Sequence, residues 1–146
     1  MSATIEPGLR QKFVLAGDAT FTIEGRDARF TYRVRSAGTN TKRKSSATHW
    51  VYVLCGPDNT NDYVFMGGVY PVVRARSATG FAFFTASSSQ LSPAAPSAVA
   101  FSWFFRHIED AKVAVFHAGT CGRCGKLLTT PESIRTGLGP VCAGRT

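Results

Sequence analysis

The chain has 146 residues, enough for one domain of ordinary size and short for two independent cores. Hydrophobic residues make up 44% of it and aromatic residues 12%, which predicts a packed core and excludes wholesale disorder. The net charge of +8, from 17 Lys and Arg against 9 Asp and Glu, favours an anionic partner, either nucleic acid or an acidic protein surface.

The N-terminal segment, MSATIEPGLRQKF, is polar and lacks the apolar centre of a signal peptide. No stretch approaches the roughly 20 apolar residues of a membrane span. We therefore expect a cytoplasmic protein with no membrane partner. Its four cysteines are then expected to stay reduced.

Strand-like patterns begin at Phe13 and predict an antiparallel sheet of four or five strands. The segments ATFTIEG and ARFTYRVR flank a predicted hairpin turn at residues 25–27. In the second of these strands, Tyr32 points to the opposite side from Arg33 and Arg35, because side chains alternate along a strand. Further strands are expected at THWVYVLCG, DYVFMGGVY and GFAFFTA.

A Ser/Pro/Ala-rich connector, SSSQLSPAAPS, precedes a predicted helix. Ser97 is expected to cap this helix, which runs to about Ile108. Phe101, Phe104 and Phe105 recur at helical spacing, so they are expected to pack against the sheet. A short strand, KVAVFH, follows the helix.

The predicted fold is α+β: an antiparallel β-sheet with one main packed helix and a C-terminal zinc knuckle. Residues 1–96 form the sheet region, with a basic loop and the connector, and residues 97–116 form the core helix and the short strand. Residues 117–146 form the zinc-knuckle module. We expect the three parts to fold as one cooperative domain.

The last quarter of the chain, CGRCGKLLTTPESIRTGLGPVCAG, contains Cys121, Cys124 and Cys142. The spacing of the first two lets one short turn present two sulfurs to a single metal ion. Thr130 is a predicted helix N-cap and Gly137 a predicted helix stop, after which the chain can return Cys142 to the same metal. The sequence therefore predicts one structural Zn²⁺ per chain.

Three thiolates are one short of the four ligands that a structural zinc site usually has. His117 ends the strand before the cysteines, and a tight turn would bring its imidazole beside them. We therefore predict a Cys3His site of His117, Cys121, Cys124 and Cys142. Cys55 and a bound water are the alternatives for the fourth ligand, and the water would leave an open site of the catalytic kind.

The segment FHAGTCGRCGKLLTTPESIRTGLGPVCAG resembles the C-terminal module of a family of small uncharacterised bacteriophage and prophage proteins. The likeness rests on His117, the three cysteines, the 128–134 segment LTTPESI and the closing GLGP. The segments FSWFFRHIED and VYVLCGPDNTNDYVFMGGVY are also similar to those proteins. The resemblance implies a zinc module and a phage or mobile-element origin, hence the cytoplasm of a host cell, but it implies no particular activity.

Basic residues gather on the second predicted strand, on the loop after it and on the cysteine segment. The predicted nucleic-acid-binding residues are Arg29, Arg33, Arg35, Lys42, Arg43, Lys44, Arg123 and Lys126. Tyr32, Trp50, Tyr52 and Tyr63 lie on the same or neighbouring strands and add rings of the kind on which single-strand binders stack bases. The alternative is a solvated outer face with the aromatic residues buried on the other side.

Enzymatic motifs are absent from the sequence, which has no phosphate-binding glycine loop, nucleophile elbow or HExxH. Acidic residues are too sparse for a clustered Mg²⁺ site. We therefore predict a non-enzymatic phage-type accessory protein that binds nucleic acid and has no small-molecule substrate. The alternative is an anti-defence role, as a protein–protein inhibitor of a host complex, although the positive charge argues against mimicry of DNA.

Overall fold

A computed structural model describes residues 3–25, 29–37, 47–57, 61–72, 80–87, 89, 91–110 and 112–145. Residues 26 and 27 of the predicted turn, and Lys42, Arg43 and Lys44 of the predicted basic loop, lie outside these ranges. The strands are β1 Ala3–Thr4, β2 Asp18–Glu24, β3 Arg29–Ser36, β4 His49–Leu54, β5 Tyr63–Pro71, β6 Phe81–Thr85 and β7 Ala114–His117. The helices are α1 Arg10–Val14, α2 Pro96–Arg106, α3 Pro131–Thr136 and α4 Pro140–Arg145.

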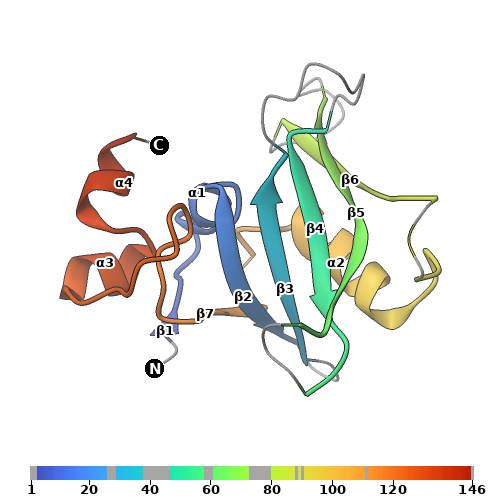
Figure 1. Cartoon of the computed structure of the whole chain (residues 1–146), viewed down its shortest axis with the longest axis horizontal. Coiled ribbons are helices and arrows are strands. Elements are labelled where there is room, and N and C mark those ends of the chain that lie inside the picture. The colour runs from blue at the N-terminus through green and yellow to red at the C-terminus, as the bar shows by residue number, and fades with distance from the viewer. Residues whose placement is uncertain are drawn as a thin grey trace.

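The strands form one antiparallel sheet in the order β1-β7-β2-β3-β4-β5-β6 (Figure 1). β2 to β6 are neighbours in chain order, whereas β7 returns from beyond α2 to pair with β2. The predicted α+β class is therefore confirmed. Besides the two helices that the sequence predicted, which are α2 and α3, the described part of the chain contains α1 and α4. Its sheet has seven strands rather than four or five.

The core lies between the sheet and α2, the longest helix of the described chain at 11 residues. Tyr32 is fully buried, and its hydroxyl donates a hydrogen bond to the carbonyl oxygen of Ser97 at 2.7 Å. The ring of Phe101 packs edge-on against both Tyr32 and Phe83, at centroid distances of 5.0 and 4.8 Å. None of the helices in the described residues is long and apolar enough to cross a membrane.

Two predicted boundaries are wrong. The N-cap of α2 is Ala95 rather than Ser97, because Pro96 has a fixed φ that suits the first helical position. Phe13 lies in α1 rather than in a strand, and β2 begins only at Asp18. The apolar run around Phe13 is too short for its period to distinguish a helix from a strand.

The two faces of the sheet differ in what covers them. Figure 1 shows α2 behind the sheet, and no helix of the described chain lies across the front of β3 and β4. α3 packs against β1, at the opposite edge of the sheet from β6. The front face of β3 and β4, here called the outer face, is therefore covered by no helix of the described residues.

Candidate metal centre and outer sheet face

The segment after β7 is a tight loop that carries Cys121 and Cys124. The backbone N–H of Cys121 donates to the carbonyl oxygen of Lys126 at 2.8 Å, and that of Gly125 donates to the carbonyl oxygen of Cys121 at 2.9 Å. Gly125 has a φ of 78°, in the left-handed region that favours glycine. These bonds fix both cysteines on one closed turn, here called the cysteine loop.

α3 lies between the cysteine loop and Cys142, and local signals set both of its ends. The side chain of Thr130 accepts a hydrogen bond from the backbone N–H of Ser133, and Pro131 occupies the first turn. Gly137 ends the helix with a φ of 77°, and its carbonyl oxygen accepts from the N–H of Gly122 at 2.8 Å. The predicted cap and stop are confirmed, and the last bond ties the helix end to the cysteine loop.

α4 then brings the third cysteine back to the loop. The sulfur atoms of Cys121, Cys124 and Cys142 all lie within 4.8 Å of one another. Cys121 is buried, Cys142 is half-buried and Cys124 is exposed. Thiolates at about 2.3 Å from one Zn²⁺ ion have sulfur–sulfur separations that fit within this limit. The three cysteines are therefore close enough to bind a metal ion.

The surroundings of Cys121 favour its thiolate. Burial raises the pKa of the Cys121 thiol, but hydrogen bonds from Gly139, Cys124 and Arg123 outweigh burial and lower the pKa to about 7. The backbone N–H groups of Gly139 and Arg123 lie 3.3 and 3.4 Å from Cys121 Sγ. Burial and the neighbouring thiols raise the pKa of Cys142 to about 11. Adjacent thiolates repel one another, and a bound cation would offset this repulsion.

His117 lies outside the cluster of described residues, which contains the three cysteines of the predicted Cys3His set. The imidazole is 1% exposed, and both of its nitrogens form hydrogen bonds with the backbone. Nδ1 accepts from the N–H of Gly119 at 2.9 Å, which leaves Nε2 to donate to the carbonyl oxygen of Ile134 at 2.7 Å. Cys55, the other candidate within the protein, follows β4 and is also outside the cluster.

Replacing His117 with asparagine separates a structural role from a ligand role. Asparagine Oδ1 can keep the bond from Gly119, but the carbonyl of Ile134 loses its donor, which costs about 1–3 kcal/mol. We expect His117→Asn to lower the midpoint of thermal unfolding and to keep the same ratio of metal to protein in elemental analysis. A folded His117→Asn protein without metal would restore His117 as a ligand.

The outer face carries two of the predicted arginines beside aromatic rings. Across β3 and β4, Arg33 pairs with Tyr52 and Arg35 pairs with Trp50. Tyr52 and Trp50 also pack against Phe65 of β5, each at a centroid distance of 5.7 Å. Because directly paired residues share a face, these arginines and rings point to the same side of the sheet.

The aromatic surface continues over β5 and β6. Tyr70 and Phe84 pack edge-on at 5.7 Å, and Phe84 is 56% exposed. Gly68 has no side chain, and a Cβ there would lie 3.1 Å from Trp50 and 3.2 Å from Tyr70, so these two rings cover it. The residues of this surface, here called the aromatic face, are Trp50, Tyr52, Phe65, Tyr70 and Phe84.

Two other predicted aromatic residues have different positions. Tyr32 is buried on the opposite face, as the alternation of β3 predicted. Tyr63 pairs with Leu54 at the end of β4. Burial raises the pKa of Tyr63, and the positive charge of Arg33 lowers it in part, so this hydroxyl lies within electrostatic reach of Arg33. Tyr63 therefore lies near Arg33, whereas Tyr32 lies on the opposite, buried face of the sheet.

Asp18 connects the outer face to the cysteine loop. Its Oδ1 lies 3.2 Å from Nε of Arg33 and 3.6 Å from Nε of Arg35, so two cations share one carboxylate. Its backbone N–H donates to the carbonyl oxygen of Gly122 at 2.7 Å. Arg123 follows in the loop, and its Nη1 is buried without a hydrogen-bond partner among the described residues. Asp18 thus contacts the arginines of β3 through its side chain and the cysteine loop through its backbone.

The remaining predicted basic residues are more dispersed. Lys126 is an exposed residue of the cysteine loop, and Arg29 lies at the start of β3, 3.8 Å from Glu24. The sequence interpretation missed Phe65, Tyr70 and Phe84. Phe65 and Tyr70 are an odd number of residues apart, so strict alternation along β5 would place them on opposite faces. The register shift opposite Val51 and Tyr52 brings them to the same face, and the sequence alone gives no signal for that shift.

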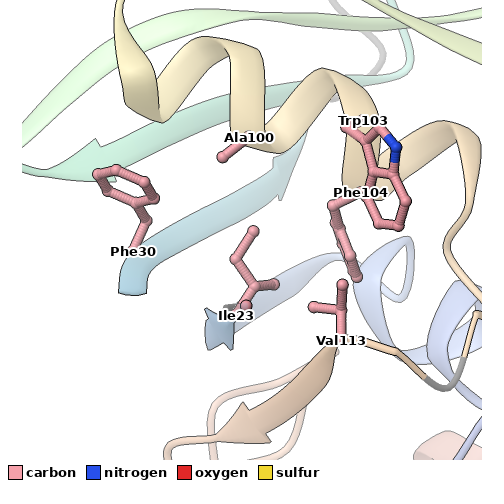
Figure 2. Close-up of a pocket in the computed structure, with 7 residues that line it drawn as sticks. Ile23, Phe30, Ala100, Trp103, Phe104 and Val113 are labelled. Carbon is pink, nitrogen blue, oxygen red and sulfur yellow. The ribbon is translucent and has the colours of Figure 1, made fainter. Parts of the chain in front are cut away.

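A small pocket opens on the other side of the sheet, between α2 and the ends of β2 and β3 (Figure 2). Its volume is about 170 Å³. On α2, Trp103 is 37% exposed at the rim of this pocket, and nearby Val99 is 53% exposed. The lining residues are mostly apolar: Ile23, Gly25, Phe30, Ala100, Trp103, Phe104 and Val113.

Comparison with known proteins covers one part of the chain. Residues 111–146 match the model of DUF6011, a family of unknown function. No curated protein and no solved structure matches the chain. The match spans β7, the cysteine loop, α3 and α4, and the family description names neither a metal nor an origin in phages. The C-terminal module, which carries the three clustered cysteines, is therefore similar to a family whose function is unknown.

Proposed function

We propose that the protein is a non-catalytic binder of single-stranded nucleic acid that uses its outer sheet face. One observation carries this proposal: Arg33 and Arg35 lie on the same side of the sheet as the five residues of the aromatic face. No helix of the described residues covers β3 and β4 on that side. The rings are half-buried or exposed rather than packed in the core, which supports a binding role over a solvated basic face.

The chemistry of the two residue types is complementary. Stacking of a base on an exposed aromatic ring contributes about 1–3 kcal/mol per base, and it needs bases that are free of a duplex. Arg33 and Arg35 share the single negative charge of Asp18, which leaves excess positive charge for phosphates. The combination favours a single strand over a duplex and gives little base specificity.

We propose that the metal is a structural Zn²⁺, one per chain, held by the three clustered cysteines. Thiolate ligands select Zn²⁺ among the common divalent ions that have no redox chemistry. In this role the metal fixes the cysteine loop, and with it Arg123 and Lys126, beside the outer face. The loop then extends the path for the phosphates beyond β3.

A matched pair of tryptophan variants tests the stacking surface. We expect Trp50→Leu to weaken the binding of a fluorescently labelled single-stranded oligonucleotide roughly tenfold, in line with the loss of one stacked base. Trp103→Leu, on α2, removes an equally large ring from the other side of the sheet and should leave the affinity unchanged. Fluorescence anisotropy gives the affinities, and circular dichroism confirms that both variants fold.

Charge variants test the phosphate contacts. Replacing Arg33 and Arg35 with Gln should reduce the slope of log affinity against log salt by about 1.4, since each contact to a single strand contributes about 0.7. Arg106→Gln, an exposed site on α2, is the control. The proposal fails if neither Trp50→Leu nor the double arginine variant weakens binding at physiological salt.

A second candidate function, inhibition of a partner protein, has one observation in its favour. Val99 and Trp103 expose apolar surface on α2 beside the pocket of Figure 2. Such a patch is typical of protein–protein contacts. In a pull-down from nuclease-treated host extract, a protein retained by the parent and by Trp50→Leu, but lost by Trp103→Leu, would favour inhibition over nucleic-acid binding.

A further inference from the structure

We infer that the metal held by Cys121, Cys124 and Cys142 has an open fourth coordination position, and that this position accepts a thiolate from a second molecule. The inference rests on the proposed metal site and adds a binding activity to it. The thiolate would come either from a small thiol or from a cysteine of another protein, a second copy of this chain included.

The donors of the described residues leave the fourth position open. Among the described residues, only the three cysteines belong to the cluster. Both nitrogens of His117 are held by the backbone, and the carboxylate of Asp18, beside the loop, is engaged with Arg33 and Arg35. Asp18 Oδ2 lies 3.7 Å from the position of a Cβ on Gly125, at the edge of the loop rather than within the cluster.

Burial places the open position at the surface. Cys121 forms the inner side of the site, where it packs with Leu128 and Leu138. Cys124 is exposed and Cys142 is half-buried, so a metal bound to all three has solvent on its outer side. Two residues near the site expose apolar surface as well: Leu127 of the cysteine loop is 74% exposed, and Val141, which precedes Cys142 in α4, is 67% exposed. A ligand from a second molecule therefore has a route to the metal.

The charges around the site favour an anionic sulfur ligand. Arg123 and Lys126 both lie on the cysteine loop, and the buried Nη1 of Arg123 has no hydrogen-bond partner among the described residues. Backbone N–H groups of Arg123 and Gly139 already point at Cys121 Sγ. A fourth thiolate completes the sulfur-rich tetrahedral set that Zn²⁺ commonly takes, and the nearby cations offset its charge.

Cobalt substitution tests the open position directly. Metal-free full-length protein is loaded with one equivalent of Co²⁺ in a phosphine reductant and then titrated with 2-mercaptoethanol. We expect a saturable rise of the sulfur-to-cobalt charge-transfer absorption by about one third, as three thiolates become four. A spectrum that does not respond to excess thiol in the parent and in Cys55→Ser alike overturns the inference. Failure to bind any metal would instead overturn the proposed metal site.

Variants exclude an internal fourth ligand. The thiol-free cobalt spectra of Asp18→Asn and His117→Asn should match that of the parent, and a changed spectrum in either one overturns the inference. Arg123→Gln should keep the cobalt and weaken the affinity for 2-mercaptoethanol several-fold, whereas Arg106→Gln should not.

The source of the thiolate follows from the oligomeric state. If Cys55 of a second copy supplies it, the metal-loaded protein forms dimers in size-exclusion chromatography that Cys55→Ser abolishes. If the source is a small thiol or another protein, the metal-loaded parent and Cys55→Ser are both monomeric, and both respond to 2-mercaptoethanol.

Discussion

Replacing Cys121 with serine is expected to remove the metal and to unfold the C-terminal module. Cys121 is the buried member of the cluster, and the small core around it contains only Leu128 and Leu138 as further buried residues among those described. So small a core would depend on the proposed metal, since structural Zn²⁺ can contribute on the order of 10 kcal/mol of apparent binding free energy. Elemental analysis and thermal unfolding of the purified variant measure both losses.

The control is a cysteine outside the cluster. Cys55→Ser should keep one metal ion per chain and the unfolding midpoint of the parent, because Cys55 is exposed. Full metal content in Cys121→Ser, or loss of metal from Cys55→Ser, would contradict the assignment of the site.

Gly137→Ala is expected to lower the free energy of unfolding by about 2–6 kcal/mol. A positive φ costs a residue with a side chain about 1–3 kcal/mol. The new Cβ would also overlap Cδ1 of Phe13 and lie 2.7 Å from its Cε1, and overpacking adds about 1–3 kcal/mol. Because Phe13 is fully buried, its ring has little room to move.

Gly80→Ala is the matched control for this change. Gly80 has a φ of 81°, close to the 77° of Gly137, but a Cβ there would meet no atom of the described residues within 4 Å. Only the backbone strain should remain, so urea denaturation should show a clearly smaller loss for Gly80→Ala. Equal losses in the two variants would mean that Gly137 does not pack tightly on Phe13.

Local signals in the sequence were sufficient for the ends of α3 and for the cysteine cluster. Thr130, Pro131 and Gly137 each act within one turn of the helix, so no distant contact is needed for their effect. The fourth ligand is a different case. The orientation of His117 depends on the pairing of β7 with β2 and on the backbone of Ile134, and neither can be read from ligand spacing.

The outer face shows the same limit. Alternation along β3 correctly separated Tyr32 from Arg33 and Arg35. That Trp50 and Tyr52 lie beside the arginines depends on the register between β3 and β4, and the inclusion of Phe84 depends on the register between β5 and β6. Registers are set by contacts across strands, which a single sequence does not contain.

Asp18 is a physical link between the sites of the two proposed activities. Its carboxylate orients Arg33 and Arg35, while its N–H holds the carbonyl oxygen of Gly122 in the cysteine loop. Any factor by which bound metal raises the affinity for nucleic acid must equal the factor by which nucleic acid raises the affinity for metal, because the two binding free energies form a closed thermodynamic cycle. If the proposed metal raises the affinity of the outer face for nucleic acid, a cell poor in zinc would reduce occupancy of that face, and bound nucleic acid would retain the metal against chelators.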